Sequence, residues 1–522
     1  MKMTQRTKVL LMTNSEHGQS NIFLALLHEL LHRESVEVHL CSYAPLQSRF
    51  DEMLSKYAPT FPADYKSRAK FHTMRGPSMI EVSSRGGSGG PLPHKPTVAG
   101  CIDFFKALDG DVWGWTKEEF LEGYKSGKEI IESIKPDITV IDQYFIQARD
   151  AAVTTGIKYC LIESMSLFRV VGKMQKNHAW LWKYPAPGTA FPYPVPAINM
   201  VQNTYLQLRI AFKYLTSPQR KKVLQWRDEA GIKGPFAWED EWKVDRLTLT
   251  PSTPDLDWSL DIPDNVIGCG PITLPTDYTA TAHELYRWVQ KGQTILINLG
   301  SLCVLDHDQV GEIACAIKQF LIESKVENLQ VLWNLGSYRS NEDTLLQTAC
   351  SILEDFCKSD RVKIVQWLDI DPVALLSTGK VVCTVHHGGA NSWFEGLKYG
   401  VPQILLPAWF DCYDNAKRTE HLGIGIWGNK TSAPRVDCDE LVESLHEIFE
   451  NEWYKLRAEM LAKKLSKVEG RTLAADHILQ AASPDHFVWG RMPSEVPELI
   501  VVHNRAGKTL TRVKPEERSN SR

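Results

Sequence analysis

The chain has 522 residues, more than one hydrophobic core usually organises, so two domains are the first expectation. Apolar residues make up 43% of the sequence and aromatic residues 10%, which excludes a largely disordered or low-complexity protein. The 59 Lys and Arg nearly balance the 63 Asp and Glu, and a net charge of -4 argues against a protein that wraps nucleic acid or coats an anionic membrane.

The N-terminal residues are not expected to act as a targeting signal. Their apolar run, 9–12, is too short for the core of a secretion signal, and no segment of the chain reaches the roughly 18 apolar residues that a membrane span needs. The cysteines, scattered from Cys41 to Cys438 without a Cys-x-x-Cys pair, favour free thiols in a reducing compartment. We therefore expect a cytoplasmic protein without a transmembrane segment.

The first half of the chain alternates apolar strands with helical segments. A strand at 8–14, a helix at 21–32 and a strand at 36–42 predict a β-α-β unit, and further strands follow at 137–142 and 157–163. Runs that are apolar throughout are typical of a parallel sheet covered on both faces. Such sheets place their functional sites at the carboxyl ends of the strands.

Three other segments lie between these units and the middle of the chain. The glycine-rich segment 83–93 lacks a preceding strand and a following helix, so it predicts a surface loop rather than a phosphate cradle. The proline- and aromatic-rich segment 183–196 and the amphipathic stretch 202–230 are candidates for the border of an acceptor pocket. The proline-containing stretch 251–275 then ends the first half.

A second series of strands repeats the architecture. The strands are expected at 294–298, 330–334, 362–366, 380–385 and 403–407, and helical patterns run from 439 to about 482. The fold class is therefore α/β. We expect a first Rossmann-like domain at 1–260, a linker at 261–292, a second Rossmann-like domain at 293–485 and a loose tail at 486–522.

The segment 386–402 is the most informative part of the sequence. An apolar strand ends at Val385, a glycine pair follows, and a helix is expected to begin near Ala390, so the unpaired amides and positive dipole end of that helix suit a diphosphate. A turn that serves packing alone is the alternative interpretation. It leaves His387 and Glu395, beside a glycine pair, without an explanation.

This segment resembles the signature of the family 1 UDP-glycosyltransferases, in which a strand is followed by His-x-Gly-x-Asn-Ser and then by Glu-Gly. The resemblance implies a GT-B fold, with two doubly wound parallel-sheet domains facing each other across a cleft, the acceptor in the first and the UDP-sugar in the second. It also implies direct displacement that inverts the anomeric centre. The matching positions are His387, Gly389, Asn391, Ser392, Glu395 and Gly396.

Other positions extend the resemblance on both sides of this segment. Trp367 stands where the family stacks a Trp on the donor base, although core packing is an equally good interpretation of this residue alone. Asp411 stands where the family binds the hydroxyls of the transferred sugar, and Asn415 fits the same signature. Cys412 replaces the usual Gln or His, which predicts a loose contact with a sugar hydroxyl or a hydroxyl left to water, while Ser301 is a candidate for phosphate. The sequence Gly-Ile-Gly-Ile-Trp at 423–427, which ends this block, resembles that of fungal members of the family.

A catalytic base is expected at the end of the first strand. An alcohol attacks an anomeric carbon only as its proton leaves, and His17 directly follows that strand, where the family has its base. Asp142 ends another strand of the same sheet and matches the family's partner carboxylate, which orients the imidazole. A surface-loop histidine and a turn-capping aspartate are the alternative interpretations.

We therefore expect a metal-independent hexosyltransferase that moves glucose from UDP-glucose to a hydroxyl of a small apolar secondary metabolite, such as a polyketide, phenolic or terpenoid. No cofactor beyond the UDP-sugar co-substrate is expected, and the protein is expected to be a monomer. A sterol or lipid glucosyltransferase and a catalytically silent nucleotide-sugar binding protein are the alternatives. The candidate acceptor residues, for which packing is an equal alternative, are Trp180, Trp182, Phe191 and Tyr193.

Overall fold

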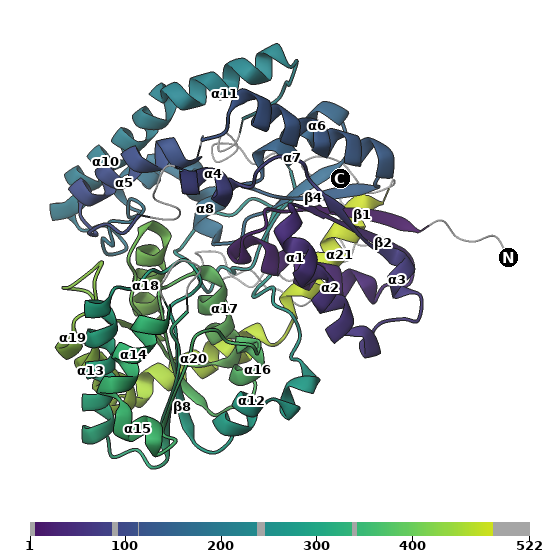
Figure 1. The fold of residues 1–522 in the computed structure, drawn as a ribbon. Helices are drawn as coiled ribbons and strands as arrows, with labels where there is room; N and C mark the ends of the chain where they lie inside the picture. Colours follow the sequence, from purple (N-terminus) through teal and green to yellow (C-terminus); the bar gives the residue numbers. More distant parts are fainter. Residues whose placement is uncertain (1–5, 86–91, 113, 237–245, 337–341, 484–522) are drawn as a thin grey trace, which may run out of the picture.

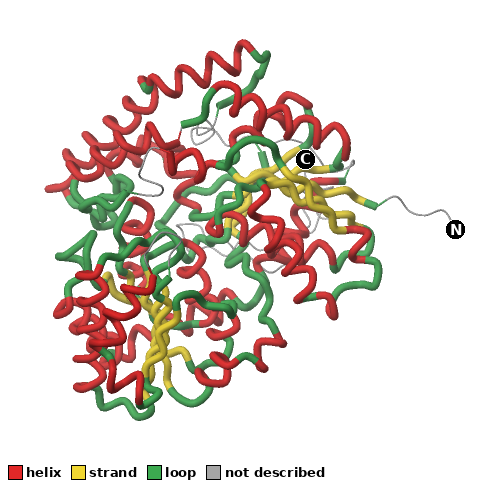
Figure 2. Tube along the Cα trace, in the orientation of Figure 1, coloured by secondary structure: helices red, strands yellow, loops and turns green. Residues whose placement is uncertain are grey.

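The protein folds into two α/β domains, each built on one parallel sheet (Figure 1). The computed structural model describes residues 6–85, 92–112, 114–236, 246–336 and 342–483. Figure 2 shows the strands of the two sheets as separate groups enclosed by helices. The predicted α/β class with two parallel-sheet domains is therefore confirmed.

The first sheet has seven strands in the order β3-β2-β1-β4-β5-β6-β7, all parallel. Its strands are β1 Thr7–Met12, β2 Val36–Ser42, β3 Ala69–Thr73, β4 Ile138–Asp142, β5 Tyr159–Ile162, β6 Thr248–Thr250 and β7 Val266–Gly268. The helices of this half are α1 His17–Leu31, α2 Gln47–Lys56, α3 Tyr65–Arg68, α4 Met79–Arg85, α5 Val98–Val112, α6 Lys117–Ile134, α7 Ile146–Thr155, α8 Leu167–Val171, α9 Ala179–Trp182, α10 Ala197–Thr216 and α11 Pro218–Glu229.

Both faces of the first sheet are buried, which explains the unbroken apolar runs of its central strands. Along β1, Val9 and Leu11 pack on the side of α1, while Leu10 and Met12 pack on the opposite side with α6 and α7. All four side chains are fully buried. The sheet is therefore rigid, and the ends of β1 and β4 provide a fixed base for the segments that follow them.

The second sheet has six parallel strands in the order β10-β9-β8-β11-β12-β13. Its strands are β8 Gln293–Asn298, β9 Leu329–Asn334, β10 Val362–Val365, β11 Val381–His386, β12 Gln403–Leu405 and β13 Gly425–Trp427. The helices are α12 Glu284–Val289, α13 His307–Glu323, α14 Glu342–Ile352, α15 Glu354–Lys358, α16 Pro372–Leu376, α17 Ala390–Tyr399, α18 Phe410–Leu422, α19 Cys438–Glu450, α20 Glu452–Leu465 and α21 Gly470–Ala482.

Two elements belong to the first domain although the sequence placed them outside it. β7 lies in the predicted linker 261–292 but pairs with β6 of the first sheet. α21 lies within the predicted second domain, 293–485, but buries Ala474, Ala475 and Ile478 in the core of the first domain. The small apolar face of α21 fits closely over α1 and the strands β1 and β4, so the first domain is completed by the last described helix.

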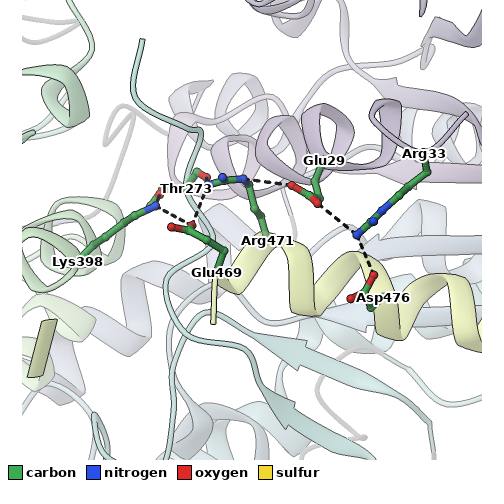
Figure 3. A network of polar contacts seen from close by, with 7 residues as sticks. All are labelled: Glu29, Arg33, Thr273, Lys398, Glu469, Arg471 and Asp476. Atoms are coloured by element: carbon green, nitrogen blue, oxygen red, sulfur yellow. Dashed lines mark hydrogen bonds and ion pairs between the residues drawn. The ribbon is translucent and has the colours of Figure 1, made fainter. Parts of the chain in front are cut away.

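A network of charged side chains marks this return of the chain (Figure 3). Lys398 of α17 donates to Thr273, at 3.0 Å, and to Glu469, at 3.1 Å. Arg471 contacts Glu469 at 2.9 Å and Glu29 of α1 at 3.3 Å. Residues from the second domain, the segment after β7 and the start of α21 therefore meet in one place.

Some predicted segments differ from the structure or lie outside it. The amphipathic stretch 202–230 belongs to two helices, α10 and α11, because Pro218 stops one and starts the next at its first position. The glycine-rich loop falls largely on residues 86–91, and the tail 486–522 falls wholly beyond residue 483, so both lie outside the described residues. Within the described part of the chain, every helix is too short or too polar to cross a bilayer.

Candidate active site

His17 is the first residue of α1 and directly follows the loop that leaves β1. Its ring meets the ring of Trp367 edge to face, with centroids 6.4 Å apart. Burial, with a smaller contribution from Arg49, lowers the pKa of His17 to about 4. The imidazole is therefore neutral at pH 7 and able to accept a proton.

Asp142 ends β4, the strand next to β1, and its side chain is buried. Its Oδ1 accepts a hydrogen bond from the Tyr144 amide at 2.9 Å, and its Oδ2 accepts from Asn14 Nδ2 at 3.3 Å and Thr13 Oγ1 at 3.5 Å. Burial raises the pKa of Asp142 to about 6 in spite of these bonds. The carboxylate thus holds the loop that leads to His17, and both residues lie at the carboxyl edge of the same sheet.

Two glycines, Gly300 after β8 and Gly389 after β11, make room for the imidazole of His387. A Cβ on Gly300 would lie 2.5 Å from His387 Cε1, and a Cβ on Gly389 would lie 2.4 Å from His387 Nε2. Gly300 also has φ +82°, a conformation that side chains rarely adopt. Burial lowers the pKa of His387 to about 3, so this ring is neutral as well. The two glycines therefore hold the ring at the start of α17.

α17 begins at Ala390 and ends with Gly400 in the left-handed conformation, as the sequence predicts. Its N-cap is Gly389, which offers no side chain to the first amides, and its first turn contains no acidic residue. Asn391 in this turn donates from Nδ2 to the backbone oxygen of His17 at 3.0 Å. The start of α17 in the second domain therefore touches the start of α1 in the first.

Glu395 lies one turn deeper in α17 than Asn391. Burial raises its pKa to about 8; Asp371 raises it further, and Lys398 opposes the shift. Ser392, between these two residues, is half-buried. The predicted donor-binding residues of α17 thus lie within the first two turns of the helix.

Trp367 follows β10 and keeps 43% of its surface exposed. Core packing, the alternative interpretation of this residue, is therefore wrong. Ser301 follows β8, where Asn298 Oδ1 accepts from the Gly300 amide at 3.2 Å and from Asn334 Nδ2 at 3.0 Å. These bonds fix the turn that carries Ser301, which is itself half-buried.

The first turn of α18 contains Asp411 and Cys412. Burial raises the pKa of Asp411 above its usual range. Cys412 is only 1% exposed and packs with Phe104 and Trp409 in an apolar cluster. The loose thiol contact with a sugar expected for Cys412 therefore has no exposed sulfur to make it in this structure. Asn415 donates to the backbone oxygen of Gly388 at 2.7 Å and so supports the glycine pair.

The four aromatic residues expected around an acceptor lie in different surroundings. Trp180 is buried, and its backbone oxygen accepts from Gln207 of α10. Trp182 is 41% exposed. Tyr193 stacks on Tyr184 and on Trp258, with centroids 5.3 and 4.7 Å apart. Phe191 is half-buried. Packing accounts for Trp180 and Tyr193, and Trp182 faces outward.

Sequence reasoning missed several polar residues beside this site. Glu163 is fully buried one residue beyond β5, accepts from the Tyr144 hydroxyl at 3.2 Å, and has its pKa raised to about 7 by burial. Arg169 donates to the same hydroxyl at 3.3 Å and lies over the ring of Phe410 in α18. Glu163 stands at the end of the predicted strand 157–163, and an acidic residue in that position was the available signal.

His94 is a further missed residue, and it joins the two domains. Its Nε2 accepts from the Phe410 amide at 2.9 Å, while its Nδ1 donates to the Lys95 backbone oxygen at 2.8 Å. Its own backbone amide donates to Ala408 at 2.9 Å. Since His94 follows the glycine-rich segment, no strand or helix pattern pointed to it. Among the described residues, no group of three or more His, Cys, Asp or Glu side chains is arranged to hold a metal ion.

Comparisons with known proteins agree with this geometry. Residues 354–472 match the family model of the C-terminal domain of erythromycin biosynthesis protein CIII-like proteins. The chain is 32% identical over 456 residues to glycosyltransferase sdnJ of Sordaria araneosa, covering 84% of this chain and 86% of that protein.

Solved structures show the same two-domain fold. A glycosyltransferase of kitacinnamycin aligns with a TM-score of 0.57 and 18% identity over 92% of this chain and 100% of its own. A UDP-glucosyltransferase from Polygonum tinctorium that glucosylates indoxyl aligns with a TM-score of 0.61 and 16% identity, over 92% of this chain and 99% of its own.

Proposed function

The chain belongs to the family 1 glycosyltransferases, and from this premise we propose that it transfers a hexose, glucose in the first instance, from a UDP-sugar to a hydroxyl of a small apolar acceptor. The enzyme has the GT-B fold and is a glycosyltransferase. The donor, the acceptor and the inverting course of the reaction are the content of the proposal.

The observation that carries this proposal is the contact between Asn391 and His17. The Asn391 amide lies 3.0 Å from the His17 backbone oxygen, so the candidate base and the candidate diphosphate-binding helix start adjoin each other. Transfer requires this arrangement, because the attacked carbon lies between the acceptor hydroxyl and the departing phosphate. Had the two elements been far apart, one substrate pair would not have spanned them.

The residues divide the reaction between the domains. The neutral imidazole of His17 takes the proton of the acceptor hydroxyl while its oxygen bonds to the anomeric carbon, and the bond from that carbon to UDP breaks. Asp142 supports the loop of His17 and stabilises the imidazolium that forms. The amides at the start of α17 and the half-buried His387 face the charge that develops on the departing diphosphate.

We assign the remaining residues of the UDP-sugar site their roles from their positions. Trp367 is exposed enough to stack on the base of the nucleotide, and Glu395 accepts hydrogen bonds from the hydroxyls of the ribose. Asp411 accepts hydrogen bonds from the hydroxyls of the transferred sugar. Relatives named for mogroside and flavonol chemistry, mogroside I-E synthase of Siraitia grosvenorii and flavonol 7-O-beta-glucosyltransferase UGT74F1 of Arabidopsis thaliana, support an apolar secondary metabolite as the acceptor class.

Product analysis tests the proposal. The purified protein is incubated with UDP-glucose, UDP-galactose or UDP-glucuronate in turn and with a library of hydroxylated polyketides, phenolics, terpenoids and sterols, and the products are identified by mass spectrometry. We expect products heavier by one hexose with UDP-glucose, and an inverted anomeric configuration by NMR. The proposal is overturned if the folded protein neither binds nor consumes any of the three donors.

The Glu395→Ala variant is expected to bind UDP-glucose about 10- to 100-fold more weakly, since removing one partner of a buried hydrogen bond costs roughly 1–3 kcal/mol. Isothermal titration calorimetry measures this change. Glu459→Ala is the matched control, because Glu459 lies on α20, which packs against α17, but its side chain is 54% exposed. Equal affinities in the two variants would remove Glu395 from the donor site.

Acid should inactivate the enzyme through Asp142. Because burial raises its pKa to about 6, this carboxylate takes up a proton as the pH falls below 6 and can no longer stabilise the imidazolium, so kcat/KM falls. His17, with its pKa lowered to about 4, stays neutral through this range. In Asp142→Asn the plateau is lower and the decline near pH 6 is absent. If the decline in kcat/KM near pH 6 persists unchanged in this variant, another group causes it. One such group is Glu16, whose pKa burial raises to about 7.

A further inference from the structure

The helix α10 carries a row of exposed apolar side chains along one side. They recur at alternating intervals of three and four residues, which places them on a single face of the helix. The exposed fractions are 87% for Ile198, 80% for Val201, 53% for Tyr205, 52% for Leu208, 60% for Phe212 and 60% for Leu215. We call these six residues the α10 stripe.

The opposite face of α10 already serves the core of the domain. Leu206 is fully buried with Cys101 of α5 and Ala186. Asn203 Nδ2 donates to the backbone oxygens of Leu181 and Tyr184, both at 2.9 Å. The helix is thus anchored by its inner face, and each side chain of the α10 stripe leaves more than half of its surface exposed. A row of six large apolar side chains in solvent is a mark of an interaction surface.

The segment of the chain that contains the α10 stripe carries charge of one sign. From 164 to 227 the chain contains no Asp or Glu. The exposed Asp103 of the neighbouring helix α5 is paired with Lys106 at 3.0 Å. By helical spacing, the exposed Arg209 and the half-buried Lys213 lie along one edge of the stripe, and Lys221 and Lys222 are exposed on α11, the next helix. Figure 1 shows α10 and α11 along the outer edge of the first domain. The net charge of -4 for the whole chain conceals this basic region.

We propose that the α10 stripe docks on the surface of an anionic lipid bilayer, with the helix lying in the plane of the interface. Apolar side chains enter the acyl boundary, and the basic residues beside them meet the lipid phosphates. Trp182 of α9, which is 41% exposed beside the first half of α10, adds an aromatic ring of the kind that prefers the headgroup level. A second copy of the chain is the poorer occupant, because it would bring two basic regions together.

Vesicle flotation with the full-length protein tests the proposal. We expect the protein to float with phosphatidylcholine vesicles that contain phosphatidylserine and to remain largely unbound with phosphatidylcholine alone. Replacing both Leu208 and Phe212 by Gln, a good helix former, should lower the bound fraction at least about tenfold, since burial of each such side chain contributes a factor of that order. Far-UV circular dichroism verifies that the variant is folded.

A matched control separates the α10 stripe from exposed apolar residues in general. Leu456 and Met460 on α20 are 49% and 52% exposed, and acidic residues such as Glu459 lie beside them. The Leu456→Gln/Met460→Gln variant should float like the wild type. Equal losses in the two double variants would contradict the assignment to α10.

The other occupants give distinct outcomes. A dimer in light scattering that the Leu208→Gln/Phe212→Gln variant converts to a monomer, without any vesicle binding, would overturn the proposal in favour of a second copy. A monomer that binds neither kind of vesicle would overturn it as well. Binding to both kinds alike would refute the role of the basic residues. Since flotation does not require catalysis, these results are independent of the proposed reaction.

Discussion

The His17→Ala variant is expected to lose transfer activity by roughly 10²–10⁴-fold, the usual contribution of a positioned general base. Burial keeps the pKa of His17 at about 4, so at neutral pH the ring is present as the base and no proton must first be removed. Alanine cannot accept the hydroxyl proton, while the backbone oxygen that binds Asn391 remains. Affinity for UDP should therefore change little.

Two comparisons make this experiment decisive. His32→Ala alters another histidine of the same helix region, one that is exposed at the end of α1, and should retain wild-type turnover. His17→Gln keeps a polar side chain beside Trp367 and should be as inactive as alanine. Initial rates with saturating donor and calorimetric titration with UDP provide the two readouts. Turnover near the wild-type value in either His17 variant would exclude the residue as the base.

Arg227→Met is expected to lower the free energy of unfolding of the first domain by about 3–5 kcal/mol, the cost of leaving one member of a buried ion pair alone. Arg227 of α11 contacts Asp150 of α7 through two bonds, at 2.9 and 3.0 Å, and the two residues are 5% and 2% exposed. Methionine fills much of the same space over Phe236 but leaves the Asp150 carboxylate without its cation. Urea unfolding followed by circular dichroism measures the loss.

The paired variant distinguishes a lost charge partner from lost packing. Asp150→Leu/Arg227→Met removes both charges and should recover most of the stability, because an apolar pair of similar volume needs no desolvated ion. Arg75→Met breaks the exposed pair with Glu129 and should cost less than about 1 kcal/mol. If Arg227→Met unfolds at the wild-type urea concentration, the buried pair contributes nothing to the fold.

The sequence predicted the central strands well because both of their faces are buried. Mainly apolar runs such as β1, β5 and β11 stand out in any sequence window. β3, with its mixed Ala-Lys-Phe-His-Thr composition, is an edge strand with one neighbour, and β13 has three residues, too few to show a period. Edge and short strands depend on their partners, which the local sequence does not reveal.

Part of the site could be predicted for a related reason. Asp142 is the last residue of β4, and His17 and the start of α17 each follow a strand after a short loop, so the strand pattern alone placed them at sheet edges. The bond from Asn391 to His17 joins residues 374 apart and depends on how the domains pack. The burial of Cys412 against Phe104 has the same origin. The helical period of α10 was visible, but its covered face carries the polar Asn203 beside Leu206 while its exposed face is apolar, so only the packing shows which face is covered.

The return of α21 to the first domain has a mechanical consequence. The chain crosses between the domains twice, once after β7 and once before α21, and Lys398 contacts both crossings through Thr273 and Glu469 (Figure 3). A hinge motion between the domains has to bend both of these connecting segments together, so the hinge axis must pass close to them. The substrates' entry therefore opens widest at the end of the interface farthest from this axis.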